Sequence, residues 1–157
     1  MGDEIGRLAQ DVHQLSRQLH PSILDDLGLT ATLRAECAAF SKQHGIPAEF
    51  MPHNVPESLP SDISLSLYRI AQESLWNAAK HAEAKQILVT LTGTGKEIVL
   101  AIHDDGNGFD LEQIKGKGGL GLVSMEERVR LVNGRLSVIS EPGKGTSVEV
   151  RIPLSES

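Results

Sequence analysis

The sequence lacks a pair of cysteines, an excess of basic residues and any long apolar run. Its single Cys37 cannot form an internal disulfide, which fits a reducing compartment. The net charge of −6 offers no general attraction to nucleic acid or to an anionic membrane surface, so neither is an expected partner. No stretch approaches the ~20 apolar residues of a membrane-spanning helix, and the N-terminus lacks the features of a signal peptide. We therefore expect a cytoplasmic domain, although a longer protein containing it could be anchored in a membrane.

A chain of 157 residues fits one domain with a substantial core. Apolar spacing predicts helices over residues 4–19, 30–42, 63–81 and 122–132, and strands over 46–51, 87–91, 98–102, 135–140 and 147–152. Ser61 and Asp62 are expected to cap the third helix, residues 52–60 to form a surface connection, and residues 109–119 to form no stable helix. Because strands and helices do not strictly alternate, we expect an α/β (α+β) two-layer sandwich: a mixed, largely antiparallel sheet with helices on one face, preceded by a helical segment.

Glu73, Asn77, Lys80 and His81 share one stripe of the long helix, because Asn77 follows Glu73 by four residues and precedes the other two by three and four. Carboxylate and amide oxygens on adjacent turns suit Mg²⁺, and the two basic side chains could lie along phosphates. A solvated helix face would look the same.

Asp104 ends a predicted strand and is followed by the segment Gly106-Asn107-Gly108, which can turn sharply. Its carboxylate could accept a hydrogen bond from the exocyclic amine of adenine. An ordinary Asp-Gly turn explains the pattern as well, whereas a calcium loop fits poorly because the required spacing of acidic ligands is missing.

Glycines at positions 116, 118, 119 and 121 precede a predicted helix, whose free N–H groups could meet phosphate oxygens. With Lys115 and Lys117, the segment could order over a bound nucleotide, although an ordinary flexible loop has the same composition. It contains neither a Walker motif nor a dinucleotide fingerprint. Turn geometry alone accounts for Gly143 and Gly145, while the Thr146 hydroxyl could join Asp104 around a base edge.

Together these clusters resemble the four nucleotide-binding motifs of the histidine-kinase, gyrase, chaperone and mismatch-repair ATPase superfamily, over roughly residues 62 to 153. Residues 72–82 (QESLWNAAKHA) resemble the asparagine motif of bacterial two-component sensor histidine kinases that signal to NarL-type response regulators. Residues 19–29 (LHPSILDDLGL) resemble the end of the dimerisation helix pair in that subgroup. The resemblance implies the end of a dimerisation and phosphotransfer helix segment over 1–29 and a catalytic ATP-binding domain of Bergerat type over 30–157.

By this resemblance, Asn77 would hold Mg²⁺, Glu73 would support the ion through water, and both would act in catalysis. Lys80 and His81 would face the phosphates of ATP, and Asp104 would read adenine. The remaining implied ATP-binding residues are Gly106 and Gly108 at the adenine pocket, Gly119, Leu120, Gly121 and Leu122 at the phosphate side and lid hinge, and Thr146 in the base network. The implied partners are a dimerisation and phosphoacceptor domain of the same protein, a second copy in a homodimer, and a response regulator.

The phosphoacceptor histidine of this family is followed directly by an acidic residue that helps take its proton. His13 is followed by Gln14 and His20 by Pro21, so neither matches. We therefore expect the chain to bind ATP without phosphorylating itself. Two rival interpretations remain: a serine kinase that inhibits a sigma factor, with Glu73 as base, and a regulatory module that binds nucleotide without chemistry. Residues 4 to 29 argue against the serine kinase.

Overall fold

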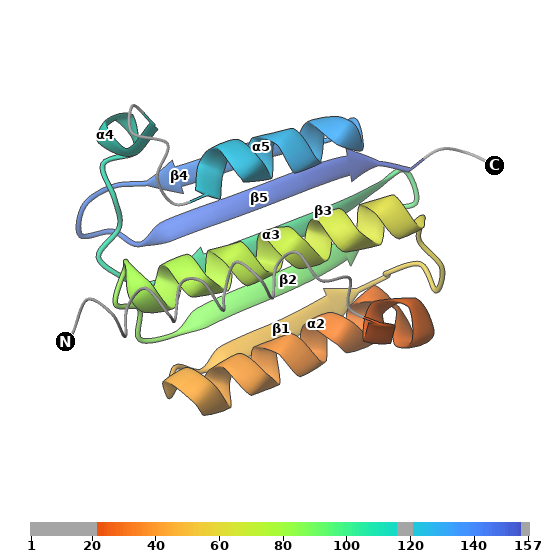
Figure 1. Ribbon diagram of the computed structural model, residues 1–157, viewed down its shortest axis with the longest axis horizontal. Coiled ribbons are helices and arrows are strands. Elements are labelled where there is room, and N and C mark those ends of the chain that lie inside the picture. Colours follow the sequence, from red (N-terminus) through yellow and green to blue (C-terminus); the bar gives the residue numbers. More distant parts are fainter. Residues whose placement is uncertain (1–21, 116–120, 155–157) are drawn as a thin grey trace.

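The structure is a computed structural model that describes residues 22–115 and 121–154. The helix expected over residues 4–19, with His13 and His20, lies outside the described residues, as do Gly119 and Leu120. The described elements, labelled as in Figure 1, are α2 (Ser22–His44), β1 (Ala48–His53), α3 (Ser61–Lys80), β2 (Ile87–Gly93), β3 (Glu97–Asp104), α4 (Leu111–Lys115), α5 (Leu122–Leu131), β4 (Arg135–Ser140) and β5 (Thr146–Pro153).

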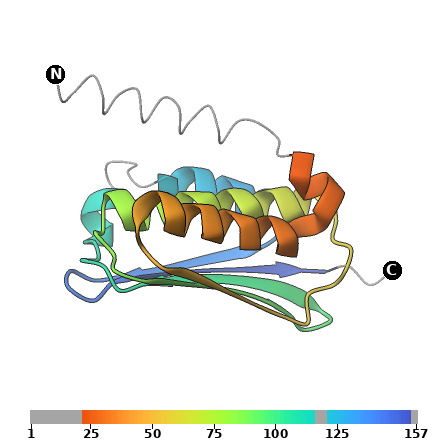
Figure 2. The same cartoon turned by 90° about the horizontal axis from the view of Figure 1, so that it is seen from below.

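The described strands form one mixed five-stranded sheet in the order β1-β2-β3-β5-β4. β1 runs parallel to β2, through a crossover that contains α3, and the other neighbouring pairs are antiparallel. Helices α2, α3 and α5 lie side by side on one face of this sheet, and no described helix covers the other face (Figures 1 and 2). The expected two-layer sandwich with a mixed, largely antiparallel sheet is therefore confirmed.

The core fills the space between the helices and the sheet. Buried and partly exposed residues alternate along β2, β3 and β5, as expected when helices cover one face of a sheet. The largest fully buried side chains are Leu33, Leu67, Ile70, Leu75, Leu91, Ile98, Leu100 and Ile152. Across the part of the chain that the structure describes, no helix combines the length and the apolar character needed to cross a membrane.

The first described helix begins earlier than predicted. α2 starts at Ser22 because two helical pieces meet at Gly28, whose φ of 83° and ψ of 172° are not helical. Glycine adopts a positive φ at little steric cost. Thr32 Oγ1 donates a hydrogen bond of 2.7 Å to the Gly28 carbonyl oxygen just after this kink. The expected boundary between residues 29 and 30 thus lies inside α2.

The cap predicted for α3 is wrong. The capping position is Pro60, which makes no side-chain capping bond, and the helix already includes Ser61 and Asp62. Asp62 Oδ1 accepts a 2.9 Å hydrogen bond from the N–H of Ile63. Its negative charge lies in the first turn of the helix, where the helix dipole favours it.

Two further differences concern β1 and α4. β1 begins two residues later than predicted and includes Pro52, which is tolerated because β1 is at the edge of the sheet. The short helix α4 forms in a stretch where we expected none. Asp110 Oδ1 accepts hydrogen bonds from the N–H groups of Glu112 (3.2 Å) and Gln113 (3.5 Å). This side-chain cap satisfies free donors at the start of α4 and favours the helix.

Candidate nucleotide-binding site

The end of β3 and the start of β5 bring Asp104 and Thr146 together. The two residues are paired in the antiparallel register of these strands. Both are buried polar residues in a molecule whose interior is otherwise mostly apolar. A buried polar pair at the end of a sheet is where a ligand with matching polar groups can bind.

The Asp104 carboxylate lies in an environment that disfavours its charge. Only 5% of the residue is exposed. Burial raises the pKa of the Asp104 carboxyl above its ordinary value, and a 2.8 Å hydrogen bond from the Gly106 N–H to Oδ1 partly opposes this effect. A ligand that brings a hydrogen-bond donor would therefore stabilise the buried charge of this carboxylate.

Asp105 has a different role from its neighbour. Its Oδ1 accepts hydrogen bonds from the N–H groups of Lys85 (2.8 Å) and Gln86 (3.0 Å). These bonds, led by the one from Gln86, lower the pKa of the exposed Asp105 carboxyl. Asp105 therefore fixes the loop between α3 and β2, and its carboxylate is committed to the backbone.

Three glycines near Asp104 allow neighbouring loops to touch. A Cβ on residue 106 would come within 2.5 Å of the Ala82 carbonyl oxygen. A Cβ on residue 108 would clash with the carbonyl of Glu141, and one on residue 145 with the carbonyl of Asp104. Gly106 and Gly108 thus shape the site through backbone packing. Turn geometry alone was expected to account for Gly145, and the structure adds this contact with Asp104.

Ser140, the last residue of β4, connects the loop after Asp104 to Thr146. Its Oγ accepts a 2.8 Å hydrogen bond from the Phe109 N–H and donates one of 3.2 Å to the Gly145 carbonyl oxygen. The same oxygen lies 2.7 Å from Thr146 Oγ1. Sequence reasoning missed Ser140, because nothing in a strand-ending serine indicates these partners.

The predicted stripe on α3 is only partly solvated. Glu73 is 7% exposed and Asn77 is half-buried, whereas Lys80 and His81 are exposed. Lys80 Nζ lies 5.4 Å from the centre of the Trp76 ring, a cation–π contact. His81 lies just beyond the last turn, and its N–H donates to the Asn77 carbonyl oxygen (3.0 Å). The polar stripe is therefore covered near Glu73 and open near Lys80.

Gly121 and Leu122, at the start of α5, lie beside this stripe of α3. Gly121 has a φ of 67°, and a Cβ there would come within 2.5 Å of Glu73 Oε1. Leu122 is buried and lines the same cavity as Asp104. The predicted phosphate-side residues that the structure describes thus lie next to the α3 stripe.

One small cavity unites most of these groups. Its polar lining consists of Ser74, Asn77, Asp104 and Thr146, and its apolar lining of Ile102, Phe109, Leu111, Leu122, Met125, Val138 and Val148. Its volume of about 20 Å³ is room for roughly one water molecule. Because a purine is larger, the lining has to open to admit one. An apolar slot with a few convergent polar groups is the usual form of a small-molecule site.

Ser74 is the residue of this cavity that we did not single out in the sequence. It is 5% exposed, and its hydroxyl has no hydrogen-bond partner among the described residues. Buried hydroxyl groups almost always have one. A serine in an amphipathic helix gives no signal in the sequence, since only the three-dimensional packing shows that its oxygen is buried and unpaired.

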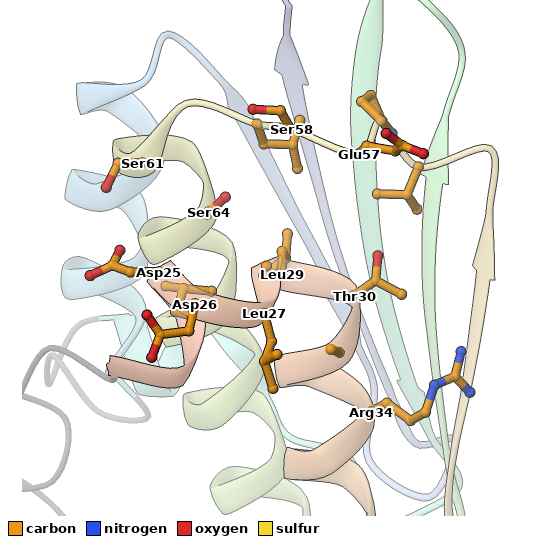
Figure 3. A pocket seen from close by; sticks show the side chains of 16 residues that line it. Asp25, Asp26, Leu27, Leu29, Thr30, Arg34, Glu57, Ser58, Ser61 and Ser64 are labelled. Atoms are coloured by element: carbon orange, nitrogen blue, oxygen red, sulfur yellow. The ribbon is translucent and has the colours of Figure 1, made fainter.

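A larger cavity of about 680 Å³ lies at the other end of α3 (Figure 3). The start of α2, the connection from β1 to α3 and the first turn of α3 line it, and its charged residues are Asp25, Asp26, Arg34 and Glu57. Three acids against one arginine would repel a triphosphate. Along the helix, Ser64 in this lining is ~20 Å from Asn77 at 1.5 Å per residue. This cavity is therefore separate from the Asp104 site.

The residues around Asn77 fit a hard metal ion that keeps most of its water. Among the described residues, no group of three or more His, Cys, Asp or Glu side chains could hold a metal on its own. Glu73 and Asn77 provide carboxylate and amide oxygens one helical turn apart. Mg²⁺ takes oxygen ligands and is often held by one or two protein groups together with phosphates.

Comparisons with known proteins identify one family of ATPases. Residues 62–156 match the family of histidine kinase-, DNA gyrase B- and HSP90-like ATPases. Over 152 residues the chain is 36% identical to the oxygen sensor histidine kinase NreB of Staphylococcus carnosus, a match that covers 97% of this chain and 44% of that protein. The chain thus spans less than half the length of this relative.

Solved structures share the fold. The histidine kinase domain of a blue-light-activated histidine kinase from Erythrobacter litoralis matches with a TM-score of 0.64 and 24% identity, over 80% of this chain and 61% of that chain. The ATP-binding domain of PrrB from Mycobacterium tuberculosis matches with a TM-score of 0.64 and 20% identity, over 81% of this chain and 94% of that chain. At these identities the likeness establishes the fold alone.

Proposed function

The chain belongs to the histidine kinase-, DNA gyrase B- and HSP90-like ATPase family as an ATP-binding domain, and we propose that it is the catalytic domain of a sensor histidine kinase. The convergence of Asp104, Thr146 and Asn77 on one cavity supports nucleotide binding most directly. The similarity to NreB favours a sensor histidine kinase among the activities of the family. Residues 30–157 would form this domain, and residues 1–29 would end the dimerisation and phosphotransfer segment.

In this proposal, adenine enters the cavity and its exocyclic amine donates a hydrogen bond to the Asp104 carboxylate. The buried carboxylate gains a donor, which offsets the unfavourable burial of its charge. Thr146 contacts the same base edge. The triphosphate extends toward the open end of the α3 stripe, where the proposed contacts are Lys80, His81, Gly121 and Leu122, together with Gly119 and Leu120 from outside the described residues.

The proposed magnesium site lies on α3 at Asn77, with Glu73 acting through water. Bound Mg²⁺ would neutralise charge on the phosphates, which is the main chemistry that phosphoryl transfer requires. Asn77 would orient the ion by its amide oxygen, and Glu73 would hold the water between them. Lys80 and His81 add positive charge at the exposed end of the stripe, where phosphates are accessible.

The proposed reaction transfers the γ-phosphoryl group of ATP to a histidine on a dimerisation domain of the same protein. A ring nitrogen of that histidine attacks the γ-phosphorus in line, the bond to the β–γ bridging oxygen breaks, and ADP leaves. Catalysis comes from positioning and charge neutralisation. The phosphoryl group then passes to an aspartate of a response regulator, for which the NarL type is proposed, and the full-length protein would act as a homodimer.

Phosphotransfer to a separately supplied dimerisation domain tests this proposal. The purified chain is incubated with ATP labelled in its γ-phosphate, Mg²⁺ and that domain. We expect label that is stable to alkali and labile to acid, as for phosphohistidine, and no label with Asn77→Ala. ATP binding without any labelled histidine would instead favour the regulatory module or the serine kinase.

A further inference from the structure

The Ser74 hydroxyl is a buried polar group without a partner in the candidate site. Ser74 lies one turn before Asn77 on α3, and both line the cavity that contains Asp104. With 5% of the residue exposed, its Oγ is removed from bulk water, and no described residue pairs with it. Leaving a buried hydroxyl unpaired is unfavourable, so its presence indicates a ligand that supplies the missing partner.

The hydroxyls of Thr146 and Ser140 share a hydrogen bond beside the cavity. A serine hydroxyl has one proton, and that of Ser140 is donated to the Gly145 carbonyl oxygen at 3.2 Å. Either hydroxyl could be the donor of the 2.7 Å contact between Ser140 and Thr146; with the Ser140 proton on Gly145, Thr146 is the donor. In that arrangement Thr146 Oγ1 offers the cavity only lone pairs, which can accept a hydrogen bond but cannot satisfy an acceptor on a ligand.

Asp104 also acts as an acceptor. Its Oδ1 already receives the Gly106 N–H at 2.8 Å, which leaves the other carboxylate oxygen for a ligand. Asn77 already has an interaction partner. Of the four polar residues in the lining, Ser74 is thus the one whose side chain has no hydrogen-bond partner within the described part of the chain.

Adenine presents an exocyclic amine flanked by two ring nitrogens, N1 and N7, which are acceptors. The Asp104 carboxylate alone would satisfy the amine and leave the adjacent ring nitrogen buried without a donor. We propose that the Ser74 hydroxyl donates a hydrogen bond to the ring nitrogen beside the amine that Asp104 recognises, directly or across one water. Ser74 is then a specificity-determining residue of the nucleotide site. This inference rests on the proposed function and extends it.

Ser74→Ala combined with ADP analogues tests this assignment. Calorimetry measures the dissociation constants of ADP, 1-deaza-ADP and 7-deaza-ADP, in which N1 or N7 is replaced by CH. We expect Ser74→Ala to weaken ADP binding by roughly fivefold to tenfold, as for one lost hydrogen bond. In the wild type, one of the two analogues binds more weakly than ADP. In Ser74→Ala, that analogue and ADP bind equally, because the donor is already gone.

Stability separates this role from a structural one. Because no described residue pairs with the hydroxyl, Ser74→Ala should weaken binding without lowering the melting temperature. A structural serine would lower both. Ser66→Ala is the matched control: Ser66 lies two turns away on the same helix, is 9% exposed, and is absent from the lining of the cavity. This control should leave the affinities for all three nucleotides unchanged.

Different results would contradict the proposed nucleotide site and the proposed role of Ser74. A wild-type chain that binds no ADP contradicts the proposed function. The role of Ser74 is overturned if the wild type binds ADP no more tightly than Ser74→Ala does. It is also overturned if the deaza analogues lose the same affinity relative to ADP in both proteins. Either result leaves the nucleotide site in place.

Discussion

Gly121 lies directly against Glu73: a Cβ on residue 121 would come within 2.5 Å of Glu73 Oε1. The two residues belong to the start of α5 and the middle of α3, and Glu73 is buried. Gly121 also has a φ of 67°, which side-chain-bearing residues rarely adopt. The backbone that leads into α5 therefore rests on the side chain that we assign to the water shell of Mg²⁺.

Gly121→Ala should impair both stability and nucleotide binding. The strained backbone and the displaced Glu73 should lower the free energy of unfolding by about 1–3 kcal/mol. Moving the carboxylate should also weaken Mg-ATP binding, measured by calorimetry. Gly143→Ala is the matched control, because Gly143 has a φ of 81° and a Cβ added there would have no neighbour within 4 Å. The Gly143→Ala variant should lose stability yet keep its affinity for Mg-ATP. Equal losses of Mg-ATP affinity in both variants would contradict a functional role for the contact between Gly121 and Glu73.

Asp104→Asn should weaken ATP binding and stabilise the empty domain. Replacing the carboxylate with an amide removes the charged acceptor for the adenine amine, at a cost of about 1–3 kcal/mol in binding. Burial raises the pKa of Asp104 in the folded protein. The folded state therefore loses stability as the pH rises from the ordinary pKa of an aspartate through the raised pKa. The asparagine avoids this cost at neutral pH, so the nucleotide-free melting temperature should rise. An unchanged dissociation constant would remove the assigned role.

Asp105→Asn should destabilise the domain, in contrast to Asp104→Asn. Hydrogen bonds from the Gln86 and Lys85 N–H groups lower the Asp105 pKa. Its carboxylate therefore contributes stability above the ordinary pKa of an aspartate, and that contribution is lost as pH falls through the lowered value. We expect Asp105→Asn to lower the melting temperature at neutral pH. Thermal melts from pH 3 to 7 should show the difference from the wild type shrinking toward low pH.

Asn77→Ala should remove the dependence of nucleotide binding on magnesium and leave the fold intact. The amide oxygen is the proposed protein ligand of the ion, and Asn77 is only half-buried, so alanine creates little cavity in the core. Calorimetry of ATP binding with Mg²⁺ and with a chelator measures the effect in both proteins. Affinities that are the same with and without Mg²⁺ in the wild type would contradict the metal assignment.

The sequence predicted most of the elements and the position of Asp104 at the end of a strand, because local patterns determine them. Alternation along 87–91 and 98–102 predicted β2 and β3, and the turn chemistry after Asp104 located the end of β3. Thr146 was expected beside Asp104, and the β3–β5 register now pairs them. The kink at Gly28 and the cap at Asp110 were missed, because a glycine or an aspartate is compatible with several local geometries until its neighbours are placed.

Burial was the harder property to predict. A solvated helix face was one interpretation of the stripe that contains Glu73, but the start of α5 covers this residue. Ser74 was overlooked because serine has no strong preference for the interior, and only the packing of α3 against the sheet and α5 encloses its hydroxyl. Ser140 became significant only when β4, β5 and the loop at Phe109 met. Each of these contacts joins segments that are distant in the sequence.

The central claim is that the cavity at Asp104 reads adenine, and thermal melts of the wild-type domain with Mg-ATP and Mg-GTP test it most directly. Guanine would place its O6 acceptor against the Asp104 carboxylate, which is repulsive. We expect Mg-ATP to raise the melting temperature by a few degrees, as for a ligand in large excess over its dissociation constant, and Mg-GTP to leave it unchanged. Equal shifts with both nucleotides, or no shift with either, would contradict the account.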